Sequence, residues 1–301
     1  MVQKNKIIII IGPTGTGKSN FAVDLAKRID GAVISADSMQ IYREMDVGTA
    51  KIMPDDYQGI DHYMLDIIDP NQEFSVAEYR ILAEEAIDDA CSKGRQPIIT
   101  GGTGLYIDSL LYPMSYGKSE RNDMLRAELN RELDLMGAEY IHGKLRQINP
   151  EAADRLHPNN TRRVIRAIEI ALSNKTQADI KDSREPIRDY LMIGLNIDRK
   201  HLYERINQRV ERMFTKGLME EVAALKEKYS MDLQSMQAIG YKEFKEFFEG
   251  NINLDGVKEL IKQNTRNYSK RQMTWFKRYD TKWFNPLIEY EEAMSYIKEN
   301  L

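Results

Sequence analysis

The feature that most constrains the fold is a glycine-rich segment close to the N-terminus, GPTGTGKS, which runs from Gly12 to Ser19. It follows five consecutive isoleucines, and a run of β-branched residues predicts a fully buried strand. The residues after it, KSNFAVDLAKRI, carry their apolar side chains at the spacing of an amphipathic helix. A segment of the form G-x-x-x-x-G-K-[ST] between a strand and a helix predicts a P-loop, which binds the phosphates of a ligand.

The residue types in this segment match the requirements of a bound diphosphate. Gly12, Gly15 and Gly17 let backbone N–H groups turn inward around an anion, helped by the positive end of the following helix. Lys18 can reach phosphate oxygens, and Ser19 is placed to bind Mg²⁺, which we predict as the cofactor. The predicted diphosphate-binding residues are Gly12, Pro13, Thr14, Gly15, Thr16, Gly17, Lys18 and Ser19.

The first third of the chain alternates strand and helix patterns. GAVISAD predicts a second buried strand, HYMLDII a short third one, and SVAEYRILAEEAIDDACSKG a helix that begins after Ser75 and stops at Gly94. QPIITGGTGLYIDSLL predicts another strand, a glycine turn and another helix. Strands that alternate with helices form a parallel sheet with helices on both faces, so we predict an α/β fold of the P-loop NTPase type.

The pattern changes in residues 118–183. This stretch is almost entirely helical in its periodicity and contains no buried strand, whereas residues 189–198, DYLMIGLNID, again predict an apolar strand. We predict the stretch to be a helical insertion domain in a P-loop core formed by residues 1–117 and 184–301. The C-terminal region of that core is predicted to be mostly helical.

Composition and charge exclude several classes of protein. The chain has 301 residues, of which 42% are hydrophobic and 30% charged, as in soluble globular proteins. Its formal net charge of −4 argues against a protein that coats nucleic acid indiscriminately. The single cysteine, Cys91, rules out an intrachain disulfide and a cysteine-ligated zinc site. No apolar stretch reaches the length of a signal peptide or a membrane helix, so we expect a cytoplasmic enzyme.

The acidic residues near the P-loop favour group transfer over nucleotide hydrolysis. A typical ATPase places an aspartate at the end of a later apolar strand to hold Mg²⁺. Here the best candidate strand, QPIITGGTG, ends in Thr100, Gly101 and Gly102, without a carboxylate. The available acid is Asp37, at the end of the second strand, where small-molecule kinases contact their acceptor. The sequence therefore indicates transfer to an acceptor.

Segments spread over nearly the whole chain resemble the tRNA dimethylallyltransferases, also called tRNA isopentenyltransferases. In order, they are GPTGTGKS, ADSMQIYREMDVGTAK, LDIIDPNQEFSVAEYR, TGGTGLY, HPNNTRRVIRAIEI, QRVERMFTKGLMEEV, QAIGYKEF and NTRNYSKRQMTWF. The P-loop by itself is unspecific, but its combination with DSMQIY, GTAK and RQMTWF is specific to this family. The chain lacks the cysteine-containing finger of the eukaryotic relatives, which is consistent with a bacterial form.

The resemblance implies a reaction and its substrates. A dimethylallyl group would move from dimethylallyl diphosphate to N6 of the adenine 3′-adjacent to the anticodon of a tRNA, and diphosphate would leave. The P-loop would then bind the leaving group, with Lys18, the loop amides and Mg²⁺ stabilising its growing charge. Arg209, in NQRVERM, resembles the family arginine that reaches the same phosphates from the other side. We expect a monomer that binds the anticodon stem-loop and no membrane.

The adenine amine is a poor nucleophile, because its lone pair is delocalised into the ring. A carboxylate that accepts an N6 proton would assist the attack, and Asp37 is the candidate base. Thr103 resembles a further contact on the acceptor side, so the predicted catalytic residues are Asp37, Lys18, Arg209 and Thr103. The adenine must leave its stacked loop to react, which predicts a channel open to RNA at one end and to the diphosphate at the other.

Basic residues predict where the RNA binds. Lys258, Lys262, Arg266 and Lys270 recur every four residues, so they would form one stripe along a helix that follows a phosphate backbone. The resemblance adds residues around HPNNTRR and DSMQ. The predicted tRNA-binding residues are Asp37, Ser38, Met39, Gln40, Thr103, Arg126, Asn159, Asn160, Thr161, Arg162, Arg163, Lys262, Arg266 and Lys270.

Three alternatives remain open from the sequence. A small-molecule or nucleotide kinase would account for the first hundred or so residues. An enzyme that prenylates free adenine nucleotides would account for the donor site. Both leave the insertion and the basic C-terminal helix without a role. A non-catalytic RNA-binding module would leave the P-loop without one.

Overall fold

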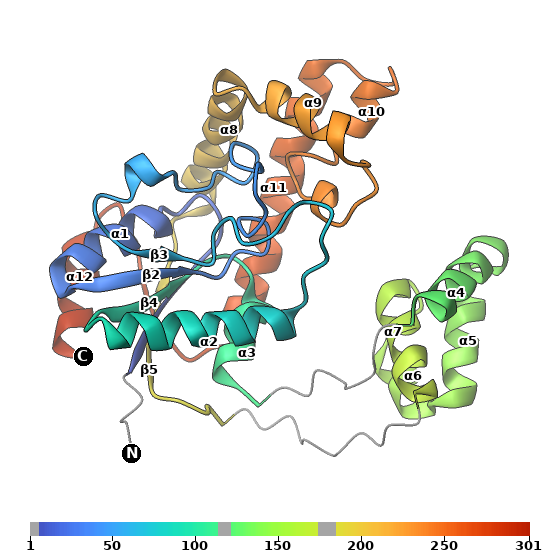
Figure 1. Cartoon of the computed structure of the whole chain (residues 1–301), viewed down its shortest axis with the longest axis horizontal. Helices are drawn as coiled ribbons and strands as arrows, with labels where there is room; N and C mark the ends of the chain where they lie inside the picture. Colours follow the sequence, from blue (N-terminus) through green and yellow to red (C-terminus); the bar gives the residue numbers. More distant parts are fainter. Residues whose placement is uncertain (1–5, 114–121, 174–184) are drawn as a thin grey trace. The chain divides into compact units, whose positions relative to one another are not determined.

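The computed structural model of the chain describes residues 6–113, 122–173 and 185–301. It consists of two compact units (Figure 1), the first comprising Met1–Tyr112 with Glu185–Leu301 and the second comprising Pro113–Arg184. Each unit has its own apolar core. The predicted domain boundaries, at residues 117/118 and 183/184, lie outside the described residues.

The first unit is built on a parallel sheet. Its strands are β1 (Ile7–Ile11), β2 (Gly31–Ser35), β3 (His62–Tyr63), β4 (Gln96–Thr100), β5 (Tyr190–Leu195) and β6 (Lys282–Phe284). They lie in the order β3-β2-β4-β1-β5-β6, so the chain first extends the sheet on one side of β1 and later on the other. In such sheets ligands bind outside the carboxyl end of the strand where the order reverses, and the P-loop follows β1 at this point.

Helices cover both faces of the sheet, which explains the unbroken isoleucine run. The covering helices are α1 (Lys18–Ile29), α2 (Val76–Ser92), α3 (Gly104–Leu111) and α12 (Tyr290–Glu299). Ile8 and Ile10 point into the core with α1 and α12, whereas Ile7, Ile9 and Ile11 point into the core with α2 and α3. All five are fully buried, as expected for a central parallel strand. The α/β fold with a P-loop is therefore confirmed.

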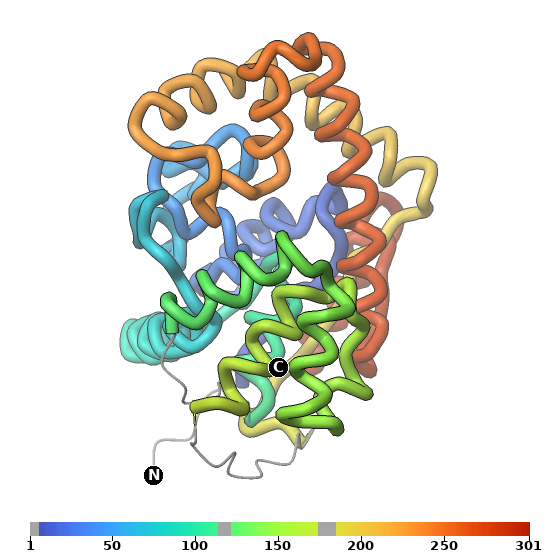
Figure 2. Tube along the Cα trace, turned by 90° about the vertical axis from the view of Figure 1, so that its right-hand side faces the viewer, coloured from blue at the N-terminus to red at the C-terminus, as the bar shows by residue number. Residues whose placement is uncertain are grey.

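Four further helices belong to the first unit. They are α8 (Arg199–Thr215), α9 (Leu218–Lys228), α10 (Phe244–Phe248) and α11 (Leu254–Phe276). Buried side chains of all four join the core on the α2 and α3 face of the sheet. Figure 2 shows α11 running along the side of the unit, and α8 packs against it. Within the described part of the chain, no helix has both the length and the apolar character of a membrane span.

The predicted limits of α2 are confirmed by its capping contacts. The Ser75 hydroxyl accepts from the Glu78 N–H at 3.2 Å, and the Glu78 carboxylate accepts from the Ser75 N–H at 2.7 Å, which forms a capping box. At the other end Gly94 adopts a φ of 71°, a conformation that favours glycine and stops the helix.

Two strands differ from what the sequence patterns predicted. HYMLDII gives only the two-residue strand β3, because Met64 and Asp66 adopt left-handed φ values of 63° and 53° and turn the chain away from the sheet. The C-terminal region contains β6, which sequence patterns did not predict. A three-residue strand has too little periodicity to be recognised, and β6 is defined by its pairing with β5.

The described residues of the second unit are helical, as predicted. Its helices are α4 (Asp123–Met136), α5 (Ala138–Ile148), α6 (Pro150–Arg155) and α7 (Thr161–Leu172). Leu129, Ile141, Leu145, Val164 and Ile168 form its core, where the four helices pack against one another (Figure 2). This core is separate from the core around the sheet, so the unit buries its own apolar faces.

Candidate active site

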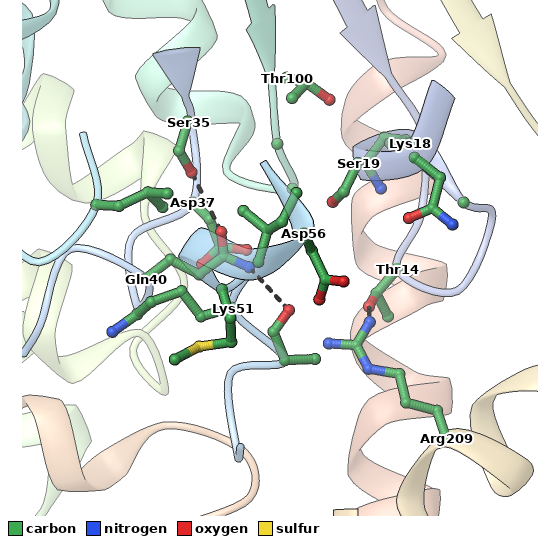
Figure 3. Close-up of a pocket in the computed structure, with 18 of the residues that line it drawn as sticks. Thr14, Lys18, Ser19, Ser35, Asp37, Gln40, Lys51, Asp56, Thr100 and Arg209 are labelled. Carbon is green, nitrogen blue, oxygen red and sulfur yellow. Dashed lines mark hydrogen bonds between the residues drawn. The ribbon is translucent and has the colours of Figure 1, made fainter. Parts of the chain in front are cut away.

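A cavity of about 1050 Å³ lies at the carboxyl ends of the central strands. The P-loop, the end of β2, the Gly101–Gly102 turn after β4 and residues of α8 and α11 line it. Figure 3 shows Lys18, Ser19 and Arg209 on one side of this cavity and Asp37 and Gln40 on the other. The predicted phosphate-side residues that line this space are Thr14, Gly15, Gly17, Lys18, Ser19 and Arg209, and the acceptor-side residues that line it are Asp37 and Gln40. Of the other predicted residues, Gly12, Pro13, Thr16, Ser38, Met39 and Thr103 are not among its lining residues.

The P-loop has the backbone conformation that its glycines predict. Gly15 and Gly17 adopt φ values of 91° and 93°, in the region that L-residues rarely occupy. Gly12 adopts a φ of 149°, and a Cβ atom there would lie 2.2 Å from the carbonyl oxygen of Leu195. A side chain at Gly12 would therefore push the P-loop away from β5.

Lys18 is poised to bind an anion. Its Nζ donates to the carbonyl oxygen of Pro13 at 2.8 Å. Burial of the ammonium group lowers the pKa of Lys18 to about 7, with Asp37 raising the pKa and Arg209 lowering it further. Among the residues that the structure describes, no carboxylate forms an ion pair with this ammonium group, so an incoming negative charge would stabilise it. Ser19, beside it, is exposed and lines the same cavity.

Two arginines of α8 hold the P-loop from the opposite side. Arg209 donates to the Thr14 hydroxyl and to the Thr49 carbonyl oxygen, both at 3.1 Å. Burial lowers the pKa of Arg209, while Asp37 raises it. Arg205 donates from Nε to the carbonyl oxygen of Gly15 at 2.8 Å. Arg209 thus contacts the P-loop and Arg205 is a second support of it, while the predicted contact of Arg209 with phosphates stays a prediction.

The acceptor side of the cavity is formed by the residues after β2 and β4. Asp37 accepts from the Met39 N–H at 2.9 Å, which orients its carboxylate. The Thr103 hydroxyl accepts from the Ser38 N–H at 3.0 Å and donates to the Ser38 hydroxyl at 3.2 Å. Met39 packs on the apolar core. Thr103 is therefore joined to the turn that carries Asp37.

Gln40 is held between the end of β2 and a loop at the cavity. Its Oε1 accepts from the Ser35 hydroxyl at 3.3 Å (Figure 3). Its Nε2 donates to the Thr49 carbonyl oxygen at 3.4 Å. The same Thr49 oxygen accepts from Arg209. The loop that contains Thr49 therefore links Gln40 on the acceptor side to Arg209 on the phosphate side.

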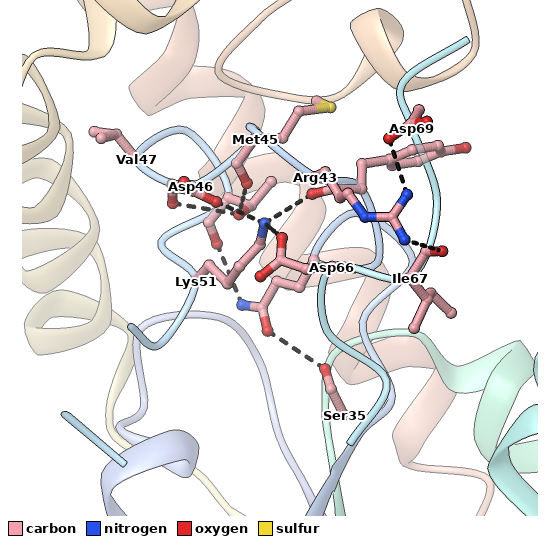
Figure 4. Close-up of polar contacts among 12 residues, drawn as sticks. Ser35, Arg43, Met45, Asp46, Val47, Lys51, Asp66, Ile67 and Asp69 are labelled. Atoms are coloured by element: carbon pink, nitrogen blue, oxygen red, sulfur yellow. Dashed lines mark hydrogen bonds and ion pairs between the residues drawn. The ribbon is translucent and has the colours of Figure 1, made fainter. Parts of the chain in front are cut away.

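Lys51 stabilises this loop from within the protein (Figure 4). Its ammonium group lies 2.6 Å from an Asp46 oxygen, 2.5 Å from an Asp66 oxygen and 2.7 Å from the Tyr42 carbonyl oxygen. Three acceptors satisfy the three donors of the ammonium group, which offsets the burial of a side chain that is only 1% exposed. Lys51 is thus a structural residue of the site.

Glu221, from α9, holds the other side of the loop. Its carboxylate accepts from three successive backbone N–H groups, those of Asp46, Val47 and Gly48, at 2.7 to 3.0 Å. It also accepts from the Tyr241 hydroxyl at 2.7 Å. A carboxylate with four donors is a strong anchor, so Glu221 fixes the loop that positions Arg209 and Gln40.

The predicted basic stripe on α11 is only partly a free positive surface. Lys262 is paired at 2.7 Å with both Glu211 and Glu259, and its side chain is 13% exposed. Arg266 donates to Asn207 at 2.7 Å, whereas Lys270 is exposed. The tRNA contact of Lys262 stays a prediction, and its spacing did not reveal the acid that α8 supplies.

The predicted RNA contacts of the insertion fall into two groups. Arg126 lies 2.8 Å from the carboxylate of Glu169, which also contacts Arg166 and is 2% exposed. Burial alone would raise the pKa of Glu169, but hydrogen bonds from Arg126, the Asn122 N–H and Arg166 lower it to about 2. Arg126 therefore has a role inside the insertion that the sequence did not predict.

The other group lies at the start of α7 and is accessible. Asn160 is the N-cap residue and Thr161 the first residue of the helix. Asn159, Asn160, Arg162 and Arg163 are exposed. A helix N-terminus with two arginines offers positive charge to a phosphate group.

Comparison with protein families identifies this arrangement. A family model described as IPP transferase matches residues 40–279. The chain belongs to the IPP transferase family. A tRNA dimethylallyltransferase of Thermoanaerobacter sp. (strain X514) is 47% identical over 306 residues, covering 98% of this chain and 96% of the relative. One from Bacillus subtilis (strain 168) is 45% identical over 286 residues, covering 94% and 91%.

Solved structures of IPP transferases have the same fold. The full-length tRNA isopentenylpyrophosphate transferase from Bacillus halodurans matches with a TM-score of 0.73 and 40% identity, over 97% of this chain and 94% of that one. A eukaryotic dimethylallyltransferase acting on tRNA matches with a TM-score of 0.81 and 29% identity, over 93% and 74%. The similarity extends over both units.

Several residues that line the cavity of this IPP transferase were not assigned a role from the sequence. They are Lys51, Arg205, Glu221, Tyr268 and Gln272. Lys51 and Gln272 lie in the motifs GTAK and RQMTWF. Those motifs were the available signal, but their function depends on partners far away in the chain.

Replacing Glu221 with alanine is expected to destabilise the IPP transferase. Three N–H groups and the Tyr241 hydroxyl would lose their acceptor, so the free energy of unfolding should fall by about 3 kcal/mol. The KM for the diphosphate substrate should rise, because Thr49 positions Arg209. Urea unfolding and steady-state kinetics measure both effects. The exposed Glu220, on the same helix, provides the control Glu220→Ala; equal stability of the two variants would contradict the anchoring role.

Proposed function

We propose that the chain transfers a dimethylallyl group from dimethylallyl diphosphate to N6 of the adenine 3′-adjacent to the anticodon of a tRNA, releasing diphosphate. The observation that carries this proposal is the cavity in which Lys18 and Arg209 face Asp37. The relatives named tRNA dimethylallyltransferase, 47% and 45% identical, support the donor and the acceptor class. A cation pair opposite one carboxylate suits a reaction that creates an anion and releases a proton.

On the donor side, the residues stabilise the leaving group. As the bond between the allylic carbon and oxygen breaks, its electron pair moves to the diphosphate oxygen. Lys18, Arg209 and the P-loop amides would surround this oxygen, and such preorganised donors need no reorganisation when charge develops. Binding of the diphosphate restores the full charge of Lys18, whose pKa of about 7 leaves it partly neutral in the free protein.

On the acceptor side, Asp37 takes up the proton. The adenine N6 forms a bond to the allylic carbon and loses one proton to the Asp37 carboxylate, which leaves the product amine neutral. The Met39 N–H orients the carboxylate at 2.9 Å. Ser38, the residue after Asp37, and Thr103 are hydrogen-bonded to each other and would position the adenine.

The residues at the P-loop also fit Mg²⁺. This ion prefers oxygen ligands and commonly binds through one or two protein groups together with substrate phosphates. The exposed Ser19 hydroxyl lines the cavity beside Lys18 and would provide such a ligand, with diphosphate oxygens supplying others. When bound, the ion supplies positive charge that stabilises the departing diphosphate.

The arginines at the start of α7 are proposed to bind the RNA backbone. The double variant Arg162→Glu, Arg163→Glu is expected to weaken tRNA binding at low salt and to reduce the slope of log Kd against log salt concentration by about 2, one per lost phosphate contact. Filter binding at several salt concentrations measures this slope. Arg131→Glu, an exposed change on α4, is the control. An unchanged slope in the double variant would exclude these arginines from the RNA surface.

The reaction itself is tested by incubating the protein with Mg²⁺, labelled dimethylallyl diphosphate and unmodified tRNA, in parallel with reactions that contain free AMP or ATP. Label in tRNA, located to the adenine N6 by nucleoside analysis, is the expected result. Label in AMP alone would favour an enzyme acting on free nucleotides. ATP turnover without alkylation would favour a kinase and overturn the proposal.

Two finer properties are part of the proposal. We expect the enzyme to act as a monomer, which light scattering of the purified protein would test. We expect it to act in the cytoplasm, where tRNA is found, and fractionation of cells that express it would test this location.

A further inference from the structure

Gln272 connects the two halves of the active site. It lies on α11, is 4% exposed, and its side-chain amide reaches two different loops. Its Oε1 accepts from the Thr14 N–H of the P-loop at 2.8 Å. Its Nε2 donates to the carbonyl oxygen of Gly102, in the turn after β4, at 3.0 Å. One buried amide thus spans the phosphate side and the acceptor side.

Each loop that Gln272 contacts leads directly to a reacting group. The P-loop carries Lys18, whereas the Gly102 turn continues into Thr103. The Thr103 N–H donates to the Ala36 carbonyl oxygen at 3.0 Å, and its hydroxyl contacts Ser38, so the turn is fixed on both sides of Asp37. Gln272 therefore contacts both the loop that carries Lys18 and the turn that is joined to the residues on either side of Asp37.

The space around Gly102 is shaped for this amide. A Cβ atom on Gly102 would lie 2.2 Å from Nε2 of Gln272, so a larger residue would displace the bridge. Tyr268, one turn earlier on α11, donates to the same Gly102 oxygen at 3.4 Å. Burial and, to a lesser extent, the negative charge of Asp37 raise the pKa of Tyr268 to about 12. Its hydroxyl therefore stays protonated and can donate.

Accordingly, we infer that Gln272 is a positioning residue, which fixes the distance between the diphosphate in the P-loop and the Asp37 carboxylate across the cavity. This inference deepens and rests on the proposed transfer reaction. Displacement reactions depend strongly on this distance, and a shift of about 1 Å lowers the rate by about 10²-fold. The amide is needed because it accepts at one end and donates at the other.

The substitution Gln272→Glu provides a test that can be switched by pH. When it is protonated, the carboxyl group introduced by this change still accepts from the Thr14 N–H and donates to the Gly102 oxygen. The ionised form only accepts, so it repels the Gly102 oxygen and adds negative charge beside the diphosphate. Burial and the Asp37 carboxylate raise the pKa of this carboxyl group, whereas Lys18, Arg209 and the Thr14 N–H lower it, and we expect the ionisation between about pH 5.5 and about pH 8.5.

The experiment compares Gln272→Glu with Gln263→Glu, an exposed change on the same helix that adds the same charge. At about pH 8.5, kcat for transfer to tRNA should be about 10²-fold lower in Gln272→Glu, with KM for tRNA changed less than about threefold. The deficit in kcat should shrink steadily towards about pH 5.5. Equal kcat values at every pH, or a deficit that does not depend on pH, would overturn the inference.

A binding measurement separates this inference from the proposed function. Calorimetry with inorganic diphosphate needs no RNA. At about pH 8.5, the affinity of Gln272→Glu for diphosphate should be about tenfold lower than that of Gln263→Glu. At about pH 5.5, the two affinities should be equal. If the wild-type protein fails to alkylate tRNA, the proposed function fails, and this pH-dependent difference still decides the role of Gln272. Equal affinities of the two variants at both pH values would overturn it.

Gly102→Ala provides a second variant that retains Gln272. Its new methyl group should displace Nε2 and lower kcat by about 10²-fold, whereas Gly143→Ala, where a Cβ meets open space, should have no effect. Both changes break the same contact between Gln272 and the Gly102 turn. The kcat of the double variant Gly102→Ala, Gln272→Glu should therefore be no lower than that of the slower single variant. Normal kcat in Gly102→Ala, or fully additive losses, would overturn the inference.

Discussion

Asp37→Asn is expected to lower kcat for dimethylallyl transfer by about 10²- to 10⁴-fold, the usual contribution of a general base. Asparagine has the same shape and can still accept from the Met39 N–H, so the turn after β2 should keep its conformation. Its amide cannot take up the N6 proton. The Kd for tRNA should change by less than about tenfold, because contacts to the RNA backbone dominate binding.

Single-turnover transfer from labelled dimethylallyl diphosphate measures this effect, since it isolates the chemical step from product release. The control is Asp55→Asn, which removes the same charge from an exposed position that does not line the cavity. A single-turnover rate within about threefold of the control would mean that another group accepts the proton.

Lys18→Met is expected to reduce kcat by about 10²- to 10³-fold, because it removes a preorganised charge from the leaving group. The KM for dimethylallyl diphosphate should also rise. In the wild type the affinity for diphosphate should decline as the pH rises through about 7, where Lys18 loses its proton in the free protein. The ratio of the affinity of Lys18→Met to that of the wild type should therefore rise with pH through this range, a comparison in which the titration of diphosphate itself cancels. Steady-state kinetics and calorimetry with inorganic diphosphate over this pH range measure both properties.

The same substitution is expected to make the ligand-free protein more stable. The pKa of Lys18 is lower in the folded protein than in the unfolded chain, so the unfolded chain binds more protons between about pH 7 and about pH 10.5. The free energy of unfolding of the wild type therefore rises with pH across this window. Below about pH 7 the charged ammonium group lowers it by a constant amount. At pH 7 the Tm of Lys18→Met should exceed that of Lys27→Met, an exposed change on the same helix. A lower Tm would show that the ammonium stabilises the empty loop.

The local part of the site was predictable from sequence. The P-loop is a strand, a turn and a helix in continuous sequence, and the glycines specify its backbone through their φ values. Asp37 was identified because it directly follows a buried strand, and parallel strands end at the same edge of a sheet. Arg209 was identified only through the family resemblance, since a helical arginine carries no local signal of its target.

The roles of the charged side chains were harder to predict, because a charge is available to RNA only when no acidic side chain of the protein pairs with it. Lys262 looks like part of a basic stripe by spacing, but Glu211 on α8 pairs with it when the two helices pack. Arg126 looks like an RNA contact, but it also holds the buried Glu169, which lies in α7 of the insertion. Electrostatic roles of this kind depend on which helix lies alongside.

Taken alone, the sequence determined the class of sheet, the phosphate-binding turn and the acid that faces it, because each depends on residues adjacent in the chain. Only the tertiary structure decided what holds these parts at a fixed spacing. The Thr14 contact with Gln272 joins residues 258 positions apart, and the Val47 contact with Glu221 joins residues 174 positions apart. Such hydrogen bonds have no sequence periodicity, since they exist only after α9 and α11 have packed beside the sheet.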